Sequence, residues 1–267
     1  MRRGLPTLAA AAIAAGLLSL TSCAAGAPAG GGSPSPTTGA GATTPTPTTI
    51  AAPTEVGAPV ECDAVDLTSG ATVSGADLAA CVVGFSRAAH SVHEVFTASD
   101  GSSGQADIVF GDAPAMAGAV VGPSGTTSFV LTSDAAWVTI DGAWVEGDTT
   151  STDSRKMLAG TIGQAYRAFA DPSVAASLIS ASGAWTVQAE AELDDLPGAG
   201  RERAWPVQAG GPFSALGTEV QEMTVWLSSS HVPIGVRATV SVGGIETTTV
   251  QRYSAWGMPV DIALPQP

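Results

Sequence analysis

Apolar and polar positions alternate along the C-terminal part of the chain, over residues 223–227 and 234–242. This period of two is typical of strands that have one apolar and one polar face. A third segment, 245–253, is rich in Thr and suits a partly solvated antiparallel sheet. A pair of glycines before it predicts a tight hairpin, because glycine accepts a positive φ at little cost. We therefore expect an antiparallel meander, with a short last strand at 260–264.

Short apolar segments separated by Gly, Pro and Asp turns also occupy the region before this meander. Such segments are typical of the strands of an antiparallel sheet. The expected strands are 107–110, 115–121, 128–132, 136–140, 143–145, 185–193 and 203–207.

Three segments show the spacing of amphipathic helices. Ser74, with Asp77 three residues later, predicts the N-terminal cap of a helix that continues to Phe96. Two further helices are expected at 154–170 and 173–179. Because no strand–helix–strand unit repeats, a parallel sheet is not expected.

The first 22 residues predict an export signal. Two arginines precede an apolar run at 8–20, which is too short to span a bilayer as a helix. The run ends in the sequence LTSC at Cys23, which resembles the lipobox of bacterial lipoproteins. That resemblance implies cleavage before Cys23, acylation of its thiol and a lipid anchor on the outer face of the cell membrane. An ordinary signal peptide with a chance Cys is the alternative.

Residues 23–60 predict a flexible linker, and residues 61–267 predict one folded domain. Of the 37 residues from 24 to 60, 33 are Gly, Pro, Ser, Thr or Ala, a composition that cannot bury a core. Cys62 and Cys81 are the two cysteines left after Cys23. In an exported protein, two remaining cysteines most simply form one disulfide.

The charge of the chain argues against a nucleic-acid partner. The formal net charge is −14, from 24 acidic and 10 basic residues. Removal of the signal takes away two arginines and leaves 8 basic residues. Binding to nucleic acid or to anionic lipid heads would need clusters of Lys and Arg, which the sequence does not have.

No pattern of catalytic residues stands out, so we do not expect an enzyme. The sequence has no Gly-x-Ser-x-Gly elbow, phosphate-binding loop, Cys-x-x-Cys pair or His-Glu-x-x-His motif. His90 and His93, with Glu94 beside them, would lie three apart on the expected first helix and suggest a metal pair. No third ligand is evident, so we expect surface residues, no metal and no cofactor.

Several short pieces of the sequence resemble one family. They are Val225-Trp226-Leu227, Pro233-Ile234, the segment 253–260 and the hairpin 140–145. Together they are similar to actinobacterial lipid-binding lipoproteins of the LppX/LprG type, which are related in fold to the LolA and LolB carriers. The resemblance implies an α+β fold: a strongly curved antiparallel half-barrel sheet with helices packed on its concave side. It also implies a lipid or glycolipid ligand, held by its acyl chains in an apolar cavity and carried or presented in the envelope. A membrane lipid exporter is one candidate protein partner.

The residues expected to line this cavity come from strand alternation and helix spacing. They are Ile108, Phe110, Phe129, Leu131, Val138, Ile140, Met157, Leu158, Ile162, Phe169, Leu178, Met223, Val225, Leu227, Ile234, Val236 and Val240.

A second interpretation remains open: an anchored, non-catalytic interaction module with a filled core, which binds another envelope protein. Trp226 and Trp256 could then serve as contact residues on an exposed face. Core-filling and cavity-lining residues have the same composition, so the sequence does not separate the two interpretations.

Overall fold

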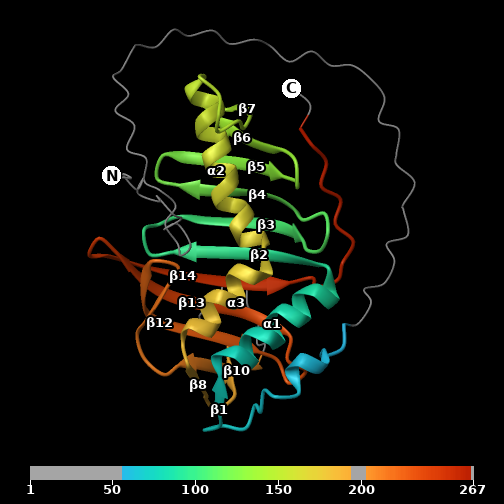
Figure 1. Cartoon of the computed structure of the whole chain (residues 1–267), viewed down its shortest axis with the longest axis vertical. Helices are drawn as coiled ribbons and strands as arrows, with labels where there is room; N and C mark the ends of the chain where they lie inside the picture. Colours follow the sequence, from blue (N-terminus) through green and yellow to red (C-terminus); the bar gives the residue numbers. More distant parts are fainter. Residues whose placement is uncertain (1–55, 194–202, 266–267) are drawn as a thin grey trace, which may run out of the picture. The chain divides into compact units, whose positions relative to one another are not determined.

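The strands of the domain form one antiparallel sheet (Figure 1). The computed structural model describes residues 56–193 and 203–265, and the sheet has 14 strands within these residues. The strands are β1 (Thr72–Ser74), β2 (Ser91–Ala98), β3 (Ser103–Val109), β4 (Ala115–Gly122), β5 (Gly125–Leu131), β6 (Ala136–Ile140), β7 (Ala143–Glu146), β8 (Ala184–Val187), β9 (Ala191–Glu192), β10 (Arg203–Ala209), β11 (Phe213–Ala215), β12 (Thr218–Leu227), β13 (Pro233–Val242) and β14 (Ile245–Ser254).

In the middle of the sheet, the last strand of the chain lies beside the second strand. The order is β1-β8-β10-β12-β13-β14-β2-β3-β4-β5-β6-β7, with β9 and β11 paired beside β10 and β12. The last strand, β14, therefore pairs with β2, for example through Tyr253 and Glu94. No pairing closes β1 onto β7 among the described residues, so the sheet is open. The expected antiparallel α+β architecture is confirmed.

Three helices lie across one face of the sheet (Figure 1): α1 (Gly75–Ala89), α2 (Ser154–Ala170) and α3 (Pro172–Ala181). Each begins at a capping side chain. Ser74 Oγ accepts a hydrogen bond from Asp77 N at 3.0 Å, which confirms the cap inferred from the sequence. Asp153 and Asp171 cap α2 and α3 in the same way. A short 3-10 turn, Val60–Cys62, precedes them.

The first helix is shorter than expected. It ends at Ala89, because His90 adopts a left-handed conformation with φ of 65°, and β2 begins at Ser91. The helical interpretation of 90–96 was wrong because Val92 and Phe96 fit both a period of two and a spacing of four. His90 and His93 are therefore not neighbours on one helix face.

The expected last strand at 260–264 is also absent, and these residues have no regular structure. Gly257, with φ of 71°, follows the end of β14. The expected strand at 185–193 is divided into β8 and the two-residue β9. The short strands β1 and β11 were not anticipated.

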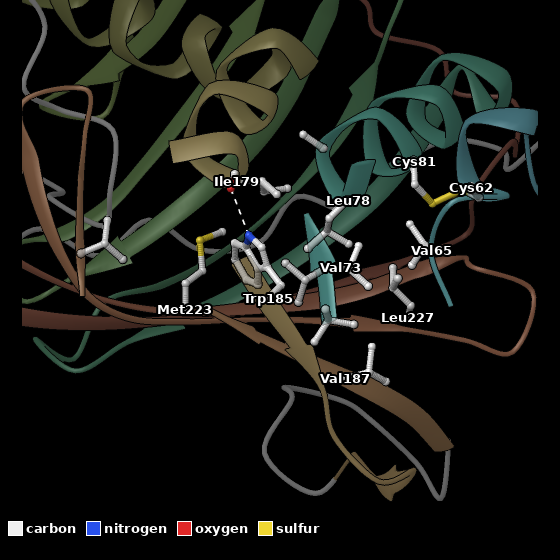
Figure 2. Close-up of a cluster of buried hydrophobic side chains, with 14 of the residues drawn as sticks. Cys62, Val65, Val73, Leu78, Cys81, Ile179, Trp185, Val187, Met223 and Leu227 are labelled. Carbon is white, nitrogen blue, oxygen red and sulfur yellow. Dashed lines mark hydrogen bonds between the residues drawn. A yellow bond between two sulfur atoms is a disulfide. The ribbon is translucent and has the colours of Figure 1, made fainter. Parts of the chain in front are cut away.

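A large cluster of buried side chains lies between α1, α3 and the strands beneath them (Figure 2). Trp185 is fully buried at its centre, and its Nε1 donates a hydrogen bond to Ile179 O at 3.2 Å. The disulfide expected between Cys62 and Cys81 is present at the edge of this cluster and joins the 3-10 turn to α1. On the chain-entropy model, such a bridge stabilises a domain by about 3 kcal/mol.

Candidate functional site

An apolar cavity of about 150 Å³ borders this cluster. Its wall comes from α1, the C-terminal end of α2, α3, and the strands β2, β3, β12, β13 and β14. Val82 of α1 and Leu178 of α3 face Val225 and Val236 of the sheet across it. The cavity therefore lies between the helices and the middle of the sheet.

Strand register explains why the sheet side of the cavity is mostly apolar. Val225 pairs with Val236, and Met223 pairs with Ala238. Directly paired residues point to the same face of a sheet, so these four form a continuous apolar surface beneath the helices. The same alternation underlies the sequence prediction for Met223, Val225 and Val236.

A β-bulge changes the orientation of one residue that was expected in the cavity. Leu227 pairs with Pro233 but Trp226 pairs with Gly235, so Ile234 is the additional residue between the two pairs. A bulge breaks the strict alternation of side chains. Ile234 consequently packs with Trp226, Leu193 and Ala204 in a separate cluster, while Pro233 lines the cavity.

The structure brings six of the seventeen expected lining residues together on the cavity wall. They are Ile108, Phe110, Leu178, Met223, Val225 and Val236.

The other expected residues lie elsewhere. Leu227 and Val240 are packed in the large buried cluster. Phe129 and Val138 pair with each other between β5 and β6, and the ring centroid of Phe129 is 4.4 Å from that of Tyr166 on α2. The remaining described positions are also outside this cavity: Leu131, Ile140, Met157, Leu158 and Ile162. Leu131 borders a second hollow beside Arg167, and Met157 is 46% exposed. The side chain of Phe169, and the whole of Cys23, lie outside the described residues.

Sequence reasoning missed the polar groups of the cavity wall. Glu94, Thr249, Gln251 and Tyr253 all line it, from β2 and β14. Gln251 Nε2 donates to Glu94 Oε1 at 2.8 Å, and the Tyr253 hydroxyl donates to Gln251 Oε1 at 3.3 Å. The available signal was the period of two in β2, which places Glu94 on the same face as Val92.

Burial is the largest cause of the pKa shifts of Glu94 and Tyr253. Glu94 is 7% exposed, and loss of hydration raises its pKa to about 7, against smaller lowering effects from the Gln251 hydrogen bond and from His93. Burial, with a smaller contribution from the Glu94 charge, raises the pKa of Tyr253 well above its ordinary value. Burial therefore shifts both groups toward their neutral forms.

Aromatic rings cluster around Trp256 at one side of the cavity. Its ring centroid lies 5.2 Å from that of Phe85, 6.3 Å from Phe110 and 5.9 Å from Tyr253. Its Nε1 donates to Pro233 O at 2.8 Å. Trp226 is buried, with 8% of its surface exposed, whereas Trp256 is only partly buried among these rings.

The histidines do not form a metal site with each other. His93 lies in β2, and its Nδ1 is 2.7 Å from Asp107 Oδ1 of β3. Within residues 56–193 and 203–265, no group of three or more His, Cys, Asp or Glu side chains is arranged to hold a metal ion.

Comparison with known proteins does not assign a family. No protein-family model matches the sequence, and no curated protein matches it. The chain is similar to a solved hypothetical protein from Chlamydia trachomatis, with a TM-score of 0.28 and 8% identity over 73% of this chain and 98% of that one. It is also similar to a LolA superfamily protein from Nitrosomonas europaea, with a TM-score of 0.22 and 11% identity over 66% and 86% of the two chains. Both TM-scores are too low to assign a fold or a function.

To cross a bilayer, a helix needs about 20 mostly apolar residues. Within the described part of the chain, none is both long and apolar enough to cross a membrane.

Proposed function

We propose that this protein is an envelope lipoprotein, anchored through Cys23, that binds a lipid or glycolipid by its acyl chains and carries or presents it. The cavity between the helices and the sheet is the observation that supports this function most strongly. The proposed architecture is a curved half-barrel of the LppX/LprG type, with its helices on the concave side.

The physical basis of binding is the burial of apolar surface. Each methylene moved from water into an apolar site contributes about 0.8 kcal/mol. Valine, leucine, isoleucine and methionine side chains from helices and sheet supply such a site here. The 37 residues from 24 to 60, between Cys23 and the domain, would let the domain move relative to an anchored Cys23.

The size of the cavity favours a second candidate function. Sites for drug-sized ligands are typically about 300–1,000 Å³, whereas this cavity measures about 150 Å³. A void of that size suits one short segment of a chain and no more, unless the helices move outward. A non-catalytic interaction module with a nearly filled core is therefore the competing function.

Filling the cavity separates the two functions. Ala175 of α3 lines the cavity, and Ala175→Trp places an indole in the space that a chain would occupy. The carrier function predicts that binding of a dansyl-labelled acyl amide falls at least tenfold, while the thermal midpoint of the unliganded protein changes little. Fluorescence titration and a melting curve measure the two effects.

Ser177→Trp is the matched control, because Ser177 is exposed on the same helix. It should leave both measurements unchanged. Equal probe binding by the two variants, or no binding by the wild-type protein, would contradict the carrier function. Native mass spectrometry of the protein purified from its own host would then identify any lipid that remains bound.

A further inference from the structure

Strand β14 presents a row of polar groups to a mostly apolar cavity. Thr249, Gln251 and Tyr253 are two residues apart along the strand, so they point to the same face and span about 13 Å. Tyr253 pairs with Glu94 of β2, which completes the row. Such groups are costly to bury in an apolar site unless they find hydrogen-bond partners.

One member of this row lacks a hydrogen-bond partner among the described residues. The Oγ1 atom of Thr249 is buried and has no hydrogen-bond partner among the described residues. Beside it, Gln251 Nε2 holds Glu94 Oε1, which fixes the Glu94 carboxyl group on the same cavity wall. Unpartnered groups on a cavity wall are where a ligand or an ordered water would bind.

The charges around the cavity indicate the chemistry of that ligand. The described lining includes no Lys, Arg or His, and its titratable groups are Glu94 and Tyr253. A phosphate or carboxylate would find no positive charge there and would face an acid. With the pKa of Glu94 raised to about 7, its carboxyl group is largely neutral in mildly acidic solution and can donate a hydrogen bond.

We propose that Glu94, Gln251 and Thr249 form a polar subsite that recognises an uncharged hydrogen-bonding group, such as a hydroxyl or ester carbonyl, on the buried chain of the ligand. This specificity rests on the proposed acyl-binding function. Glu94 and Thr249 bind the ligand group directly, and Gln251 orients the carboxyl group of Glu94. The subsite would select oxygenated chains over plain hydrocarbon and over chains with a charged end in the cavity.

Four probes with the same chain length test this subsite: octan-1-ol, octane, octanoate and octyltrimethylammonium. Titration at pH 6, followed by NMR of the Met223 methyl group in the cavity, gives a dissociation constant for each. Wild-type protein should bind octanol at least as tightly as octane. A purely apolar cavity would instead bind octanol about tenfold more weakly or worse, because the hydroxyl would be buried without a partner.

Two variants test which residues of the subsite bind the hydroxyl of octanol. Thr249→Val keeps the side-chain shape and removes the unpartnered hydroxyl, so the fold should be preserved. Glu94→Leu removes the acid. Each should weaken octanol binding about three- to tenfold and leave octane binding unchanged. Thr247→Val, on the same strand and the same face but outside the cavity lining, should change neither constant.

The outcomes distinguish this inference from the proposed function. Tighter binding of octane than of octanol by the wild-type protein overturns the polar subsite and leaves acyl binding intact. Tightest binding of octyltrimethylammonium overturns it in favour of recognition of a cation by ionised Glu94 and the aromatic rings. If the wild type and both variants bind octanol equally, water rather than the ligand hydroxyl contacts the polar row, and the polar subsite is overturned. If none of the four probes binds, the acyl-binding function fails together with its subsite.

Discussion

Two regions of the domain cover the sheet in different ways. Helix α2 packs on β4–β7 through small residues, and its fully buried positions with described side chains are Ala159, Gly160, Gly163 and Ala170. Helices α1 and α3 contribute Leu78, Phe85 and Ile179, which are large and fully buried. The cavity lies beneath α1 and α3 and reaches only the last turn of α2.

The difference shows that side-chain size at a helix–sheet contact sets the space left between the layers. A Cβ added to Gly163 would lie 2.4 Å from Ala136 Cβ, so α2 lies very close to β6. Gly160 similarly approaches the backbone of Thr149. Under α1 and α3, large buried side chains fill the space between the layers, and the filling is incomplete at the cavity. Met157, which is exposed, and Ile162 lie on α2 outside the cavity although they have helical apolar spacing.

The largest effect is expected from Glu94, at the boundary between the two regions. Its pKa of about 7 in the folded protein exceeds the ordinary 4.5, so the folded state binds the proton more tightly than the unfolded state. Folding is therefore most favourable below pH 4.5 as far as this group is concerned, and its contribution is lost as pH rises through about 7. Between pH 5 and pH 8, the free energy of unfolding should fall by about 2–3 kcal/mol because of Glu94.

Glu94→Gln should abolish most of that loss, because the amide stays neutral at both pH values. Urea denaturation at pH 5 and pH 8 measures the difference. Glu246→Gln, an exposed acid on β14, is the control and should retain the wild-type pH dependence. A Glu94→Gln protein that loses as much stability as the wild type would show that the carboxyl group is hydrated in the folded state.

The close contact of α2 should be the next most sensitive feature. Gly163→Leu forces the helix away from Ala136, and overpacking of this kind typically costs about 1–3 kcal/mol. The better helix propensity of Leu offsets up to about 1 kcal/mol of that cost. Gln164→Leu, one position along on the exposed side, should leave the denaturation midpoint nearly unchanged. Equal midpoints for the two variants would mean that α2 can move without loss of packing.

Local patterns in the sequence predicted much of the sheet and less of the cavity. The alternation in 223–227 and the glycine pair after Val242 correspond to β12 and to the turn between β13 and β14. The bulge at Ile234 depends on pairing with β12, which no local pattern encodes. Likewise, Glu94 becomes a buried group only because β14 pairs with β2, across 159 residues of sequence. The cavity depends on how far each helix stands from the sheet, so apolar spacing alone overestimated its wall.

The smallest effects are expected from removing the helix caps of the two regions. Ser74→Ala removes the cap of α1 and Asp153→Ala removes that of α2, and each change typically costs about 1 kcal/mol. Because the sheet is continuous from β1 to β7 through the β14–β2 pairing, we expect the domain to unfold as one unit. Both variants should then lower the same single denaturation midpoint by similar amounts. Ser180→Ala, at an exposed position in the last turn of α3 and away from any cap, should have almost no effect.

If Asp153→Ala instead produced a separate early transition, with amide exchange increased in α2 and β5–β7 alone, the region of close contact would be an independent unit. The cavity would then border a region that can open without unfolding the large buried cluster, which would give a larger ligand a way in.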